Sequence, residues 1–172
     1  MIKVGPVGGY GECKMSTVWD EKGRDQVAGF LVTYRKNSIY SLQFLYYENG
    51  SLVLSNRHGC ADDKLKSYSA VVFDYPSEYL TSVKCSVKNG PLMFMTSIRF
   101  GTNKGFYGPF GTPSTDGADI NFNLEIGNHC LFGGFHGSEN SHGVGSIGVY
   151  VKTQGHDLER SSSKALKRTK IY

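Results

Sequence analysis

The chain has 172 residues, enough for one domain with a sizeable hydrophobic core and a terminal extension. Charged residues make up 20% of it and hydrophobic residues 39%, which excludes a wholly disordered chain. The formal net charge is +4, and five basic residues against two acidic ones fall between Thr153 and Tyr172. The rest of the chain is therefore close to neutral, which disfavours a broad nucleic-acid surface and makes nucleic acid an unlikely partner.

The first residues, MIKVGPVGGYG, contain no apolar run long enough for a signal peptide. No stretch reaches the roughly eighteen apolar residues that a membrane span needs, so no membrane partner is expected. We therefore expect a cytoplasmic or nucleocytoplasmic protein.

The four cysteines form no C-x-x-C pair, and in a reducing compartment we expect free thiols at Cys13, Cys60, Cys85 and Cys130. His58 near Cys60 and His129 beside Cys130 match no zinc-site spacing. The sequence predicts neither a metal site nor another cofactor.

A periodicity of two, typical of β-strands, dominates the chain, and no amphipathic helix precedes residue 155. The glycine-rich, aromatic-rich composition also favours short strands and tight turns. In chain order we expect strands at 2–4 and 28–34, a hairpin at 41–55 that turns at Asn49-Gly50, strands at 70–75 and 79–87, a hairpin at 95–111, and strands at 119–127 and 146–152. With shorter strands the total is about ten to twelve, which indicates an all-β fold.

Three short segments share a serine, an aliphatic residue, a variable residue and an apolar residue. They are SLQF at 41–44, SIRF at 97–100 and SIGV at 146–149. Their starts lie 56 and 49 residues apart, which suggests three similar units of a threefold all-β arrangement. After the last strand the composition changes to serines and basic residues. We expect a folded domain at 1–152 and a flexible basic tail at 153–172, with a turn of helix on a partner as the alternative for the tail.

Four stretches together resemble a known family. They are VGPVGGYG at 4–11 followed by WDEKG at 19–23, FDYPSEYLTSV at 73–83, SIRFGTNKGFYGPFGT at 97–112, and GGFHGS at 133–138 followed by GSIGVYV at 145–151. Over about residues 2–152 the chain resembles plant jacalin-related lectins, of the single-domain, nucleocytoplasmic, mannose-specific-like branch. It most resembles small members linked to plant defence, including the restriction of virus movement. The resemblance implies a β-prism I fold, in which three four-stranded antiparallel Greek-key sheets surround a pseudo-threefold axis.

The resemblance also implies a sugar site between an N-terminal glycine-rich loop and the loop before the last strand. The family pattern in that last loop is glycine, three variable residues and aspartate. An ionised carboxylate accepts hydrogen bonds from adjacent sugar hydroxyls, and glycine lets backbone amides approach the ring. In this chain the aspartate position holds Gly145 and the glycine position holds Ser141. In the facing loop Gly8-Gly9 is intact, but Gly11 is followed by Glu12.

The predicted carbohydrate-binding site is degenerate and consists of Gly9, Gly11, Glu12, Glu139, Ser141, His142, Gly143, Val144 and Gly145. Hydrogen bonds to a charged group contribute roughly 1.5–3 kcal/mol, and millimolar binding amounts to only about 4 kcal/mol. Losing the carboxylate therefore threatens the binding of simple sugars. Glu139 in the same loop or Glu12 in the facing loop could replace it; the alternative is that both are solvated. His136 and His142 are further candidate donors.

Two functions follow. The first is a non-enzymatic lectin-like protein in plant defence, whose ligand, if sugar binding is retained, is a mannose- or glucose-type glycan, with a homo-oligomer as a possible source of avidity. The alternative is a jacalin-fold interaction module that has lost sugar binding and acts in defence through protein partners. The sequence offers no nucleophile–base pair with an orienting group and no phosphate loop, so no catalytic residue is predicted.

Overall fold

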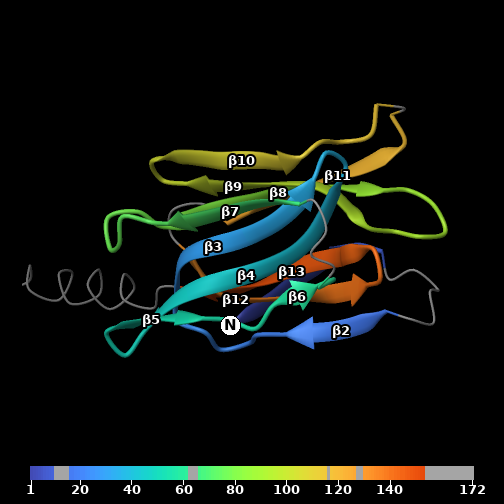
Figure 1. Ribbon diagram of the computed structural model, residues 1–172. Helices are drawn as coiled ribbons and strands as arrows, with labels where there is room; N and C mark the ends of the chain where they lie inside the picture. The colour runs from blue at the N-terminus through green and yellow to red at the C-terminus, as the bar shows by residue number, and fades with distance from the viewer. Residues whose placement is uncertain (10–15, 62–65, 116, 127–129, 154–172) are drawn as a thin grey trace, which may run out of the picture.

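The computed structural model describes residues 1–9, 16–61, 66–115, 117–126 and 130–153, and the regular structure in these ranges is β-strand (Figure 1). The strands are β1 (Ile2–Gly8), β2 (Thr17–Asp20), β3 (Gln26–Arg35), β4 (Ser38–Glu48), β5 (Ser51–Leu54), β6 (His58–Gly59), β7 (Ser67–Val72), β8 (Leu80–Lys88), β9 (Met95–Thr102), β10 (Gly105–Gly111), β11 (Asp119–Glu125), β12 (Cys130–Asn140) and β13 (Gly143–Thr153). Within the described ranges no helix is long and apolar enough to cross a membrane.

These strands form three antiparallel sheets with one common plan (Figure 1). Sheet A has the order β1-β13-β12-β2, sheet B the order β5-β4-β3-β7, and sheet C the order β10-β9-β8-β11. The short strand β6 also pairs with β4, next to the stretch that β5 occupies, so β5 and β6 share one edge of sheet B. Each sheet therefore has four strand positions around a central hairpin: β12–β13, β3–β4 or β8–β9. The Greek-key β-prism predicted by the family resemblance is confirmed.

The inner faces of the three sheets meet in one aromatic core. Phe30 of sheet B stacks on Phe100 of sheet C, with ring centroids 3.9 Å apart. Phe44 of sheet B stacks on Phe135 of sheet A at 3.8 Å. All four rings are fully buried. Stacked aromatic pairs contribute about 0.5–1.5 kcal/mol beyond their buried area, so these two contacts tie sheet B to both of its neighbours.

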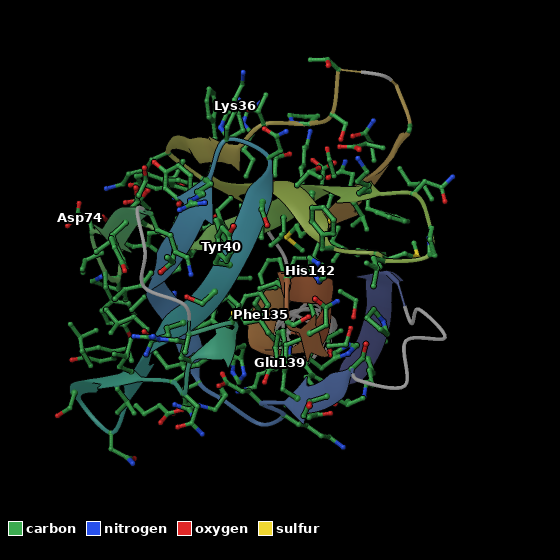
Figure 2. All side chains as sticks on the ribbon, turned by 45° about the vertical axis from the view of Figure 1, so that its right-hand side comes forward. Lys36, Tyr40, Asp74, Phe135, Glu139 and His142 are labelled. Carbon is green, nitrogen blue, oxygen red and sulfur yellow. The ribbon has the colours of Figure 1, made fainter. Side chains whose placement is uncertain are left out.

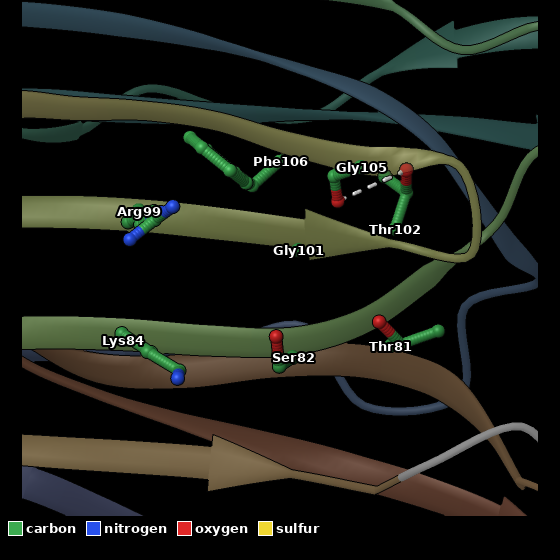
Figure 3. Close-up of a pocket in the computed structure, with 8 residues that line it drawn as sticks. All are labelled: Thr81, Ser82, Lys84, Arg99, Gly101, Thr102, Gly105 and Phe106. Carbon is green, nitrogen blue, oxygen red and sulfur yellow. Dashed lines mark hydrogen bonds between the residues drawn. The ribbon is translucent and has the colours of Figure 1, made fainter.

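The weak sequence repeat marks structurally equivalent strands. SLQF lies in β4, SIRF in β9 and SIGV in β13, each the second strand of a central hairpin. In all three, the serine, the aliphatic residue and the fourth residue are buried. The variable third residue points out of the prism, as Arg99 does in sheet C (Figure 3). The threefold arrangement predicted from this repeat is confirmed.

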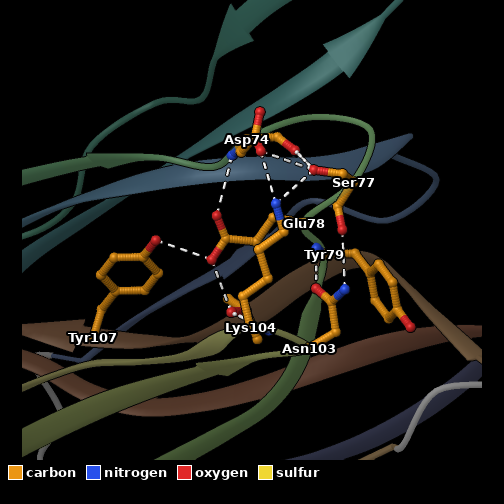
Figure 4. Close-up of polar contacts among 8 residues, drawn as sticks. Asp74, Ser77, Glu78, Tyr79, Asn103, Lys104 and Tyr107 are labelled. Carbon is orange, nitrogen blue, oxygen red and sulfur yellow. Dashed lines mark hydrogen bonds and ion pairs between the residues drawn. The ribbon is translucent and has the colours of Figure 1, made fainter.

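The FDYPSEY and TNKG motifs form one polar clamp (Figure 4). The Glu78 carboxylate is buried and accepts hydrogen bonds from the Thr102 hydroxyl at 2.8 Å and the Tyr107 hydroxyl at 2.9 Å. Its other oxygen accepts the N–H of Asp74 at 3.1 Å. The clamp therefore fastens the turn before β8 to the hairpin of β9 and β10.

Asn103 completes the clamp from the hairpin side. Its side-chain oxygen accepts the N–H of Tyr79 at 2.9 Å, and its amide donates to the carbonyl of Ser77 at 2.9 Å. Lys104 pairs with Asp74 at 2.7 Å on the surface. These motifs carry much of the family resemblance, and each residue in them has a structural partner.

Opposing effects act on the pKa of Glu78. Burial raises it, whereas the hydrogen bonds from Asp74, Thr102 and Tyr107 stabilise the carboxylate, with a smaller effect from the charge of Lys104. The net pKa of Glu78 lies below its ordinary value.

Glu78→Gln should lower the free energy of unfolding by about 1–3 kcal/mol at neutral pH, because its amide group would face a donor that the carboxylate now satisfies. Since the folded state lowers the pKa of Glu78, the carboxylate's contribution is complete above 4.5 and is lost as the pH falls through its folded pKa. Urea unfolding from about pH 7 to about pH 3 should show the difference from wild type shrinking in acid. The exposed Glu125→Gln variant is the control, and a difference independent of pH would contradict this role of Glu78.

Candidate functional site

Loops from all three sheets meet at one end of the prism. The Ser38 hydroxyl, at the turn of β3 and β4, donates to the carbonyl of His142 at 3.3 Å. The Asn140 side chain donates to the carbonyl of Met93, between β8 and β9, at 3.1 Å. Phe94 stacks on His142 with ring centroids 5.9 Å apart. These contacts fix the position of the β12–β13 turn relative to the other two sheets.

The predicted loop before the last strand is a two-residue turn. β12 continues through Asn140 and β13 begins at Gly143, so that only Ser141 and His142 lie between them. Both turn residues are exposed, whereas Gly143, Val144 and Gly145 are buried strand residues. The prediction that residues 141–145 form a loop was wrong for 143–145. The glycines there lie in strand β13, where they allow close packing.

Gly145 is the extra residue of a β-bulge. Ser138 pairs with Ser146 and Glu139 pairs with Val144, which leaves Gly145 without a partner in β12. A β-bulge re-aims the side chain of the bulged strand. A Cβ at position 145 would lie 3.0 Å from the Ser138 hydroxyl and 3.5 Å from the Asn140 amide nitrogen. A side chain at position 145 would therefore lie beside two hydrogen-bond donors.

The Gly8-Gly9 pair lets the N-terminal segment lie directly on its neighbours. Gly8 has a φ of +107°, and a Cβ there would lie 2.7 Å from the carbonyl oxygen of Gly145. A Cβ at Gly9 would overlap the side chain of Met93. The carbonyl oxygen of Gly9 accepts the Ser138 hydroxyl at 3.4 Å, which places Gly9 beside β12, whereas Gly11 and Glu12 lie outside the described residues.

Glu139 has a different partner from the one predicted. Its carboxylate accepts the N–H of Gly59, on β6 of sheet B, at 2.6 Å. Neighbouring strand residues point to opposite faces, and it is Ser138 and Asn140 that face the position-145 side chain. Glu139 therefore joins sheet A to sheet B and is not presented beside Gly145, which corrects the idea that it replaces the aspartate.

His136 is not a loop residue either. It lies in β12 with only 2% of its surface exposed, and its Nε2 is 3.1 Å from the carbonyl oxygen of Val4. Burial, assisted by the positive charge of Lys3, lowers the pKa of His136. A Cβ at Gly148 would overlap the imidazole, so this glycine makes room for the ring. His136 therefore fastens β1 to sheet A and does not reach a ligand.

An open concavity of about 460 Å³ lies next to the turn. Lys36, Tyr40, Phe94 and His142 are among its lining residues, and Figure 2 labels three of them. Of the predicted site residues, Ser141 and His142 line this space, whereas Gly9 and Gly145 are buried beside it. Sequence reasoning missed Lys36, Tyr40 and Phe94, because they come from two other sheets.

His58 has structural partners, whereas His129 and Cys13 lie outside the described residues. His58 Nε2 lies 2.6 Å from the Glu21 carboxylate, and its ring stacks on Trp19 at 4.1 Å. Cys60, Cys85 and Cys130 are free thiols, as predicted, and burial raises the pKa of Cys85 to about 12. In the part of the chain that the structure describes, no three His, Cys, Asp or Glu side chains are grouped to hold a metal.

Residues 4–150 match the family model of the Jacalin-like lectin domain. The chain belongs to this family. Among its relatives in Arabidopsis thaliana, Protein RESTRICTED TEV MOVEMENT 1 is 34% identical over 158 residues, covering 88% of this chain and 87% of the relative. Jacalin-related lectin 24 is 36% identical over 159 residues, covering 88% of this chain and 67% of the relative.

Solved structures agree with this assignment. Single-chain recombinant jacalin superposes with a TM-score of 0.75 at 29% identity, covering 88% of this chain and 93% of the other. A mannose-specific jacalin-related lectin from Morus nigra in complex with mannose gives a TM-score of 0.74 at 25% identity, covering 88% and 94%. The family and its fold are those of non-enzymatic carbohydrate-binding proteins.

Glu139→Ala should lower the free energy of unfolding by about 1–2 kcal/mol, because it leaves the Gly59 N–H without its acceptor. Glu139→Gln keeps an acceptor oxygen and should lose less. Urea unfolding of both variants measures this, and calorimetry with mannose should find no change in sugar affinity. If Glu139→Ala instead lost sugar binding at unchanged stability, Glu139 would be assigned to the ligand site.

Proposed function

We propose that this protein is a non-enzymatic, lectin-like carbohydrate-binding protein whose ligand is a mannose- or glucose-type glycan. The observation that carries the proposal is the setting of position 145: the β-bulge, the two donors Ser138 and Asn140, and the close contact of Gly8 with the Gly145 carbonyl oxygen. The mannose complex of the related Morus nigra lectin supports the same ligand class for this chain.

The sugar would bind at the end where the β12–β13 turn meets Gly9 and the β8–β9 loop. Ser141 and His142 are exposed there and offer side-chain hydrogen-bonding groups to sugar hydroxyls. Because the aspartate is missing, roughly 1.5–3 kcal/mol of an interaction worth about 4 kcal/mol is lost. Binding of a single sugar would therefore be weak, and a multivalent glycan or a homo-oligomer would supply useful affinity.

A protein-interaction module is the second candidate. It is favoured by the burial of Gly145 and by the use of the Glu139 carboxylate between two sheets. The 34% identity to Protein RESTRICTED TEV MOVEMENT 1 supports a role in plant defence. In this alternative the protein acts through protein partners in the cytoplasm or nucleus. In this alternative the concavity beside His142 would contact a protein.

Gly145→Asp should increase the affinity for methyl mannoside at least tenfold, because it restores the carboxylate beside two donors. Gly145 lies outside the left-handed backbone region, so the change adds no backbone strain, and Ser138 needs to shift only slightly. Gly145→Asn is the matched control, with the same shape and no charge. Ser51→Asp adds a carboxylate on the distant strand β5. Titration calorimetry with methyl mannoside and a branched mannose oligosaccharide measures all four proteins.

Measurable binding of the branched oligosaccharide by wild type supports the lectin. If wild type shows no detectable sugar binding and only Gly145→Asp gains it, the result supports the interaction module on an intact lectin scaffold. Absence of detectable sugar binding in both wild type and Gly145→Asp would contradict the assignment of this end of the prism as a sugar site.

A further inference from the structure

The three outer faces of the prism differ at their equivalent centres. In each central hairpin one outward residue pairs directly with another across the strands. These pairs are His136 with Gly148 in sheet A, Leu31 with Gln43 in sheet B, and Lys84 with Arg99 in sheet C. At equivalent positions, sheet A therefore has a buried imidazole beside a glycine, sheet B has an uncharged pair, and sheet C has a pair of cations.

The cation pair of sheet C is unfavourable for folding by itself. Like charges at directly opposed sheet positions repel each other. Among the described residues neither Lys84 nor Arg99 forms an ion pair with a carboxylate. Arg99 is instead held over the ring of Phe106, with its Cζ 3.5 Å from the ring centroid. Phe106, on the edge strand β10, is 61% exposed, so the guanidinium is oriented on an open surface.

Two adjoining concavities share these cations. One of about 220 Å³ is lined by Lys84 and Arg99 together with hydroxyl groups of Thr81, Ser82 and Thr102 (Figure 3). The other, of about 320 Å³, is lined by the same cations with Ser86, Ser97, Asn121 and Asn123. In the first concavity the hydroxyl groups of Thr81 and Ser82 lie beside the two positive charges, and Arg99 is held by Phe106, which suits an anionic group flanked by sugar hydroxyls. The second concavity also has apolar walls from Cys85, Pro109 and Phe122.

Carboxylates at the β11 edge limit the length of the ligand. Glu125 accepts the Asn123 amide at 3.1 Å, and Asp119 accepts the N–H of Ser114 at 2.7 Å. A nucleic acid that runs along the face would meet these charges and would find only two central cations, whereas tight duplex binding uses about 6–10 phosphate contacts. A short chain with few charges fits the face better.

We propose that the outer face of sheet C binds an acidic oligosaccharide, a short sugar chain that carries carboxylate or sulfate groups. Arg99 and Lys84 bind the anionic group, and the hydroxyl and amide groups around them bind ring hydroxyls. This site lies on a sheet face and shares no residue with the β12–β13 turn, so it does not depend on the neutral-sugar site proposed above.

Titration of the full chain with three tetrasaccharides tests this proposal: a galacturonate tetramer with carboxylates, a heparin-derived tetramer with sulfates, and neutral maltotetraose. The double variant Lys84→Gln/Arg99→Gln should weaken binding of the preferred acidic tetramer at least tenfold. Lys22→Gln/Arg57→Gln removes one lysine and one arginine from exposed positions outside sheet C and should leave affinity within about twofold. Thermal unfolding of the site variant should show at most a small loss of stability, because the variant removes a like-charge pair together with the contact of Arg99 on Phe106.

Several results would overturn the proposal. These are absence of binding of both acidic tetramers at millimolar concentration, equal losses in the site and control variants, or equal binding of maltotetraose. Tighter binding of an eight-nucleotide single-stranded oligothymidylate, lost in the same site variant, would assign the face to nucleic acid instead. Methyl mannoside titrations report on the other site, so the two proposals can fail separately.

Discussion

The fold depends on the stacking of aromatic rings where the inner faces of the three sheets meet. Phe30 on Phe100 and Phe44 on Phe135 join sheet B to its two neighbours, and all four rings are excluded from water. Such packing fixes the register of each central hairpin, because a shift by one residue would turn its buried side chains outward. The positions of the turns at the prism ends follow from that register.

The packing of these hairpins sets the geometry of the candidate site. The bulge at Gly145 aims its side-chain position toward Ser138 and Asn140, while the neighbouring Glu139 points toward sheet B and caps the N–H of Gly59. A carboxylate shifted by one place along a strand cannot replace a missing one, because neighbouring side chains point to opposite faces. Sequence proximity to the lost aspartate was therefore a poor guide to chemical substitution.

Much of the fold could be predicted from local sequence. Alternating apolar residues located most strands, and the Asn49-Gly50 turn has φ values of 49° and 80°, as its hairpin requires. β12 was not predicted, because the reason for its Gly137 is a contact with another strand. A Cβ at this position would overlap the carbonyl oxygen of Ser146. The short strands β2 and β6 carry too few residues to show a period, and the partner of Glu139 lies 80 residues away. The strands follow from local pattern, whereas these site contacts are set by tertiary packing.

The residues that reveal the family and the residues that decide the ligand are different sets. Glu78 and Asn103, which lie in the most specific motifs, fasten turns to strands through buried or backbone-directed hydrogen bonds. Outward positions such as those of Gln43 and Arg99 share one scaffold place, yet the core does not constrain their chemistry. Family membership therefore fixes the prism, while the two proposed ligand sites, at the bulge of position 145 and on the outer face of sheet C, depend on residues outside the aromatic core.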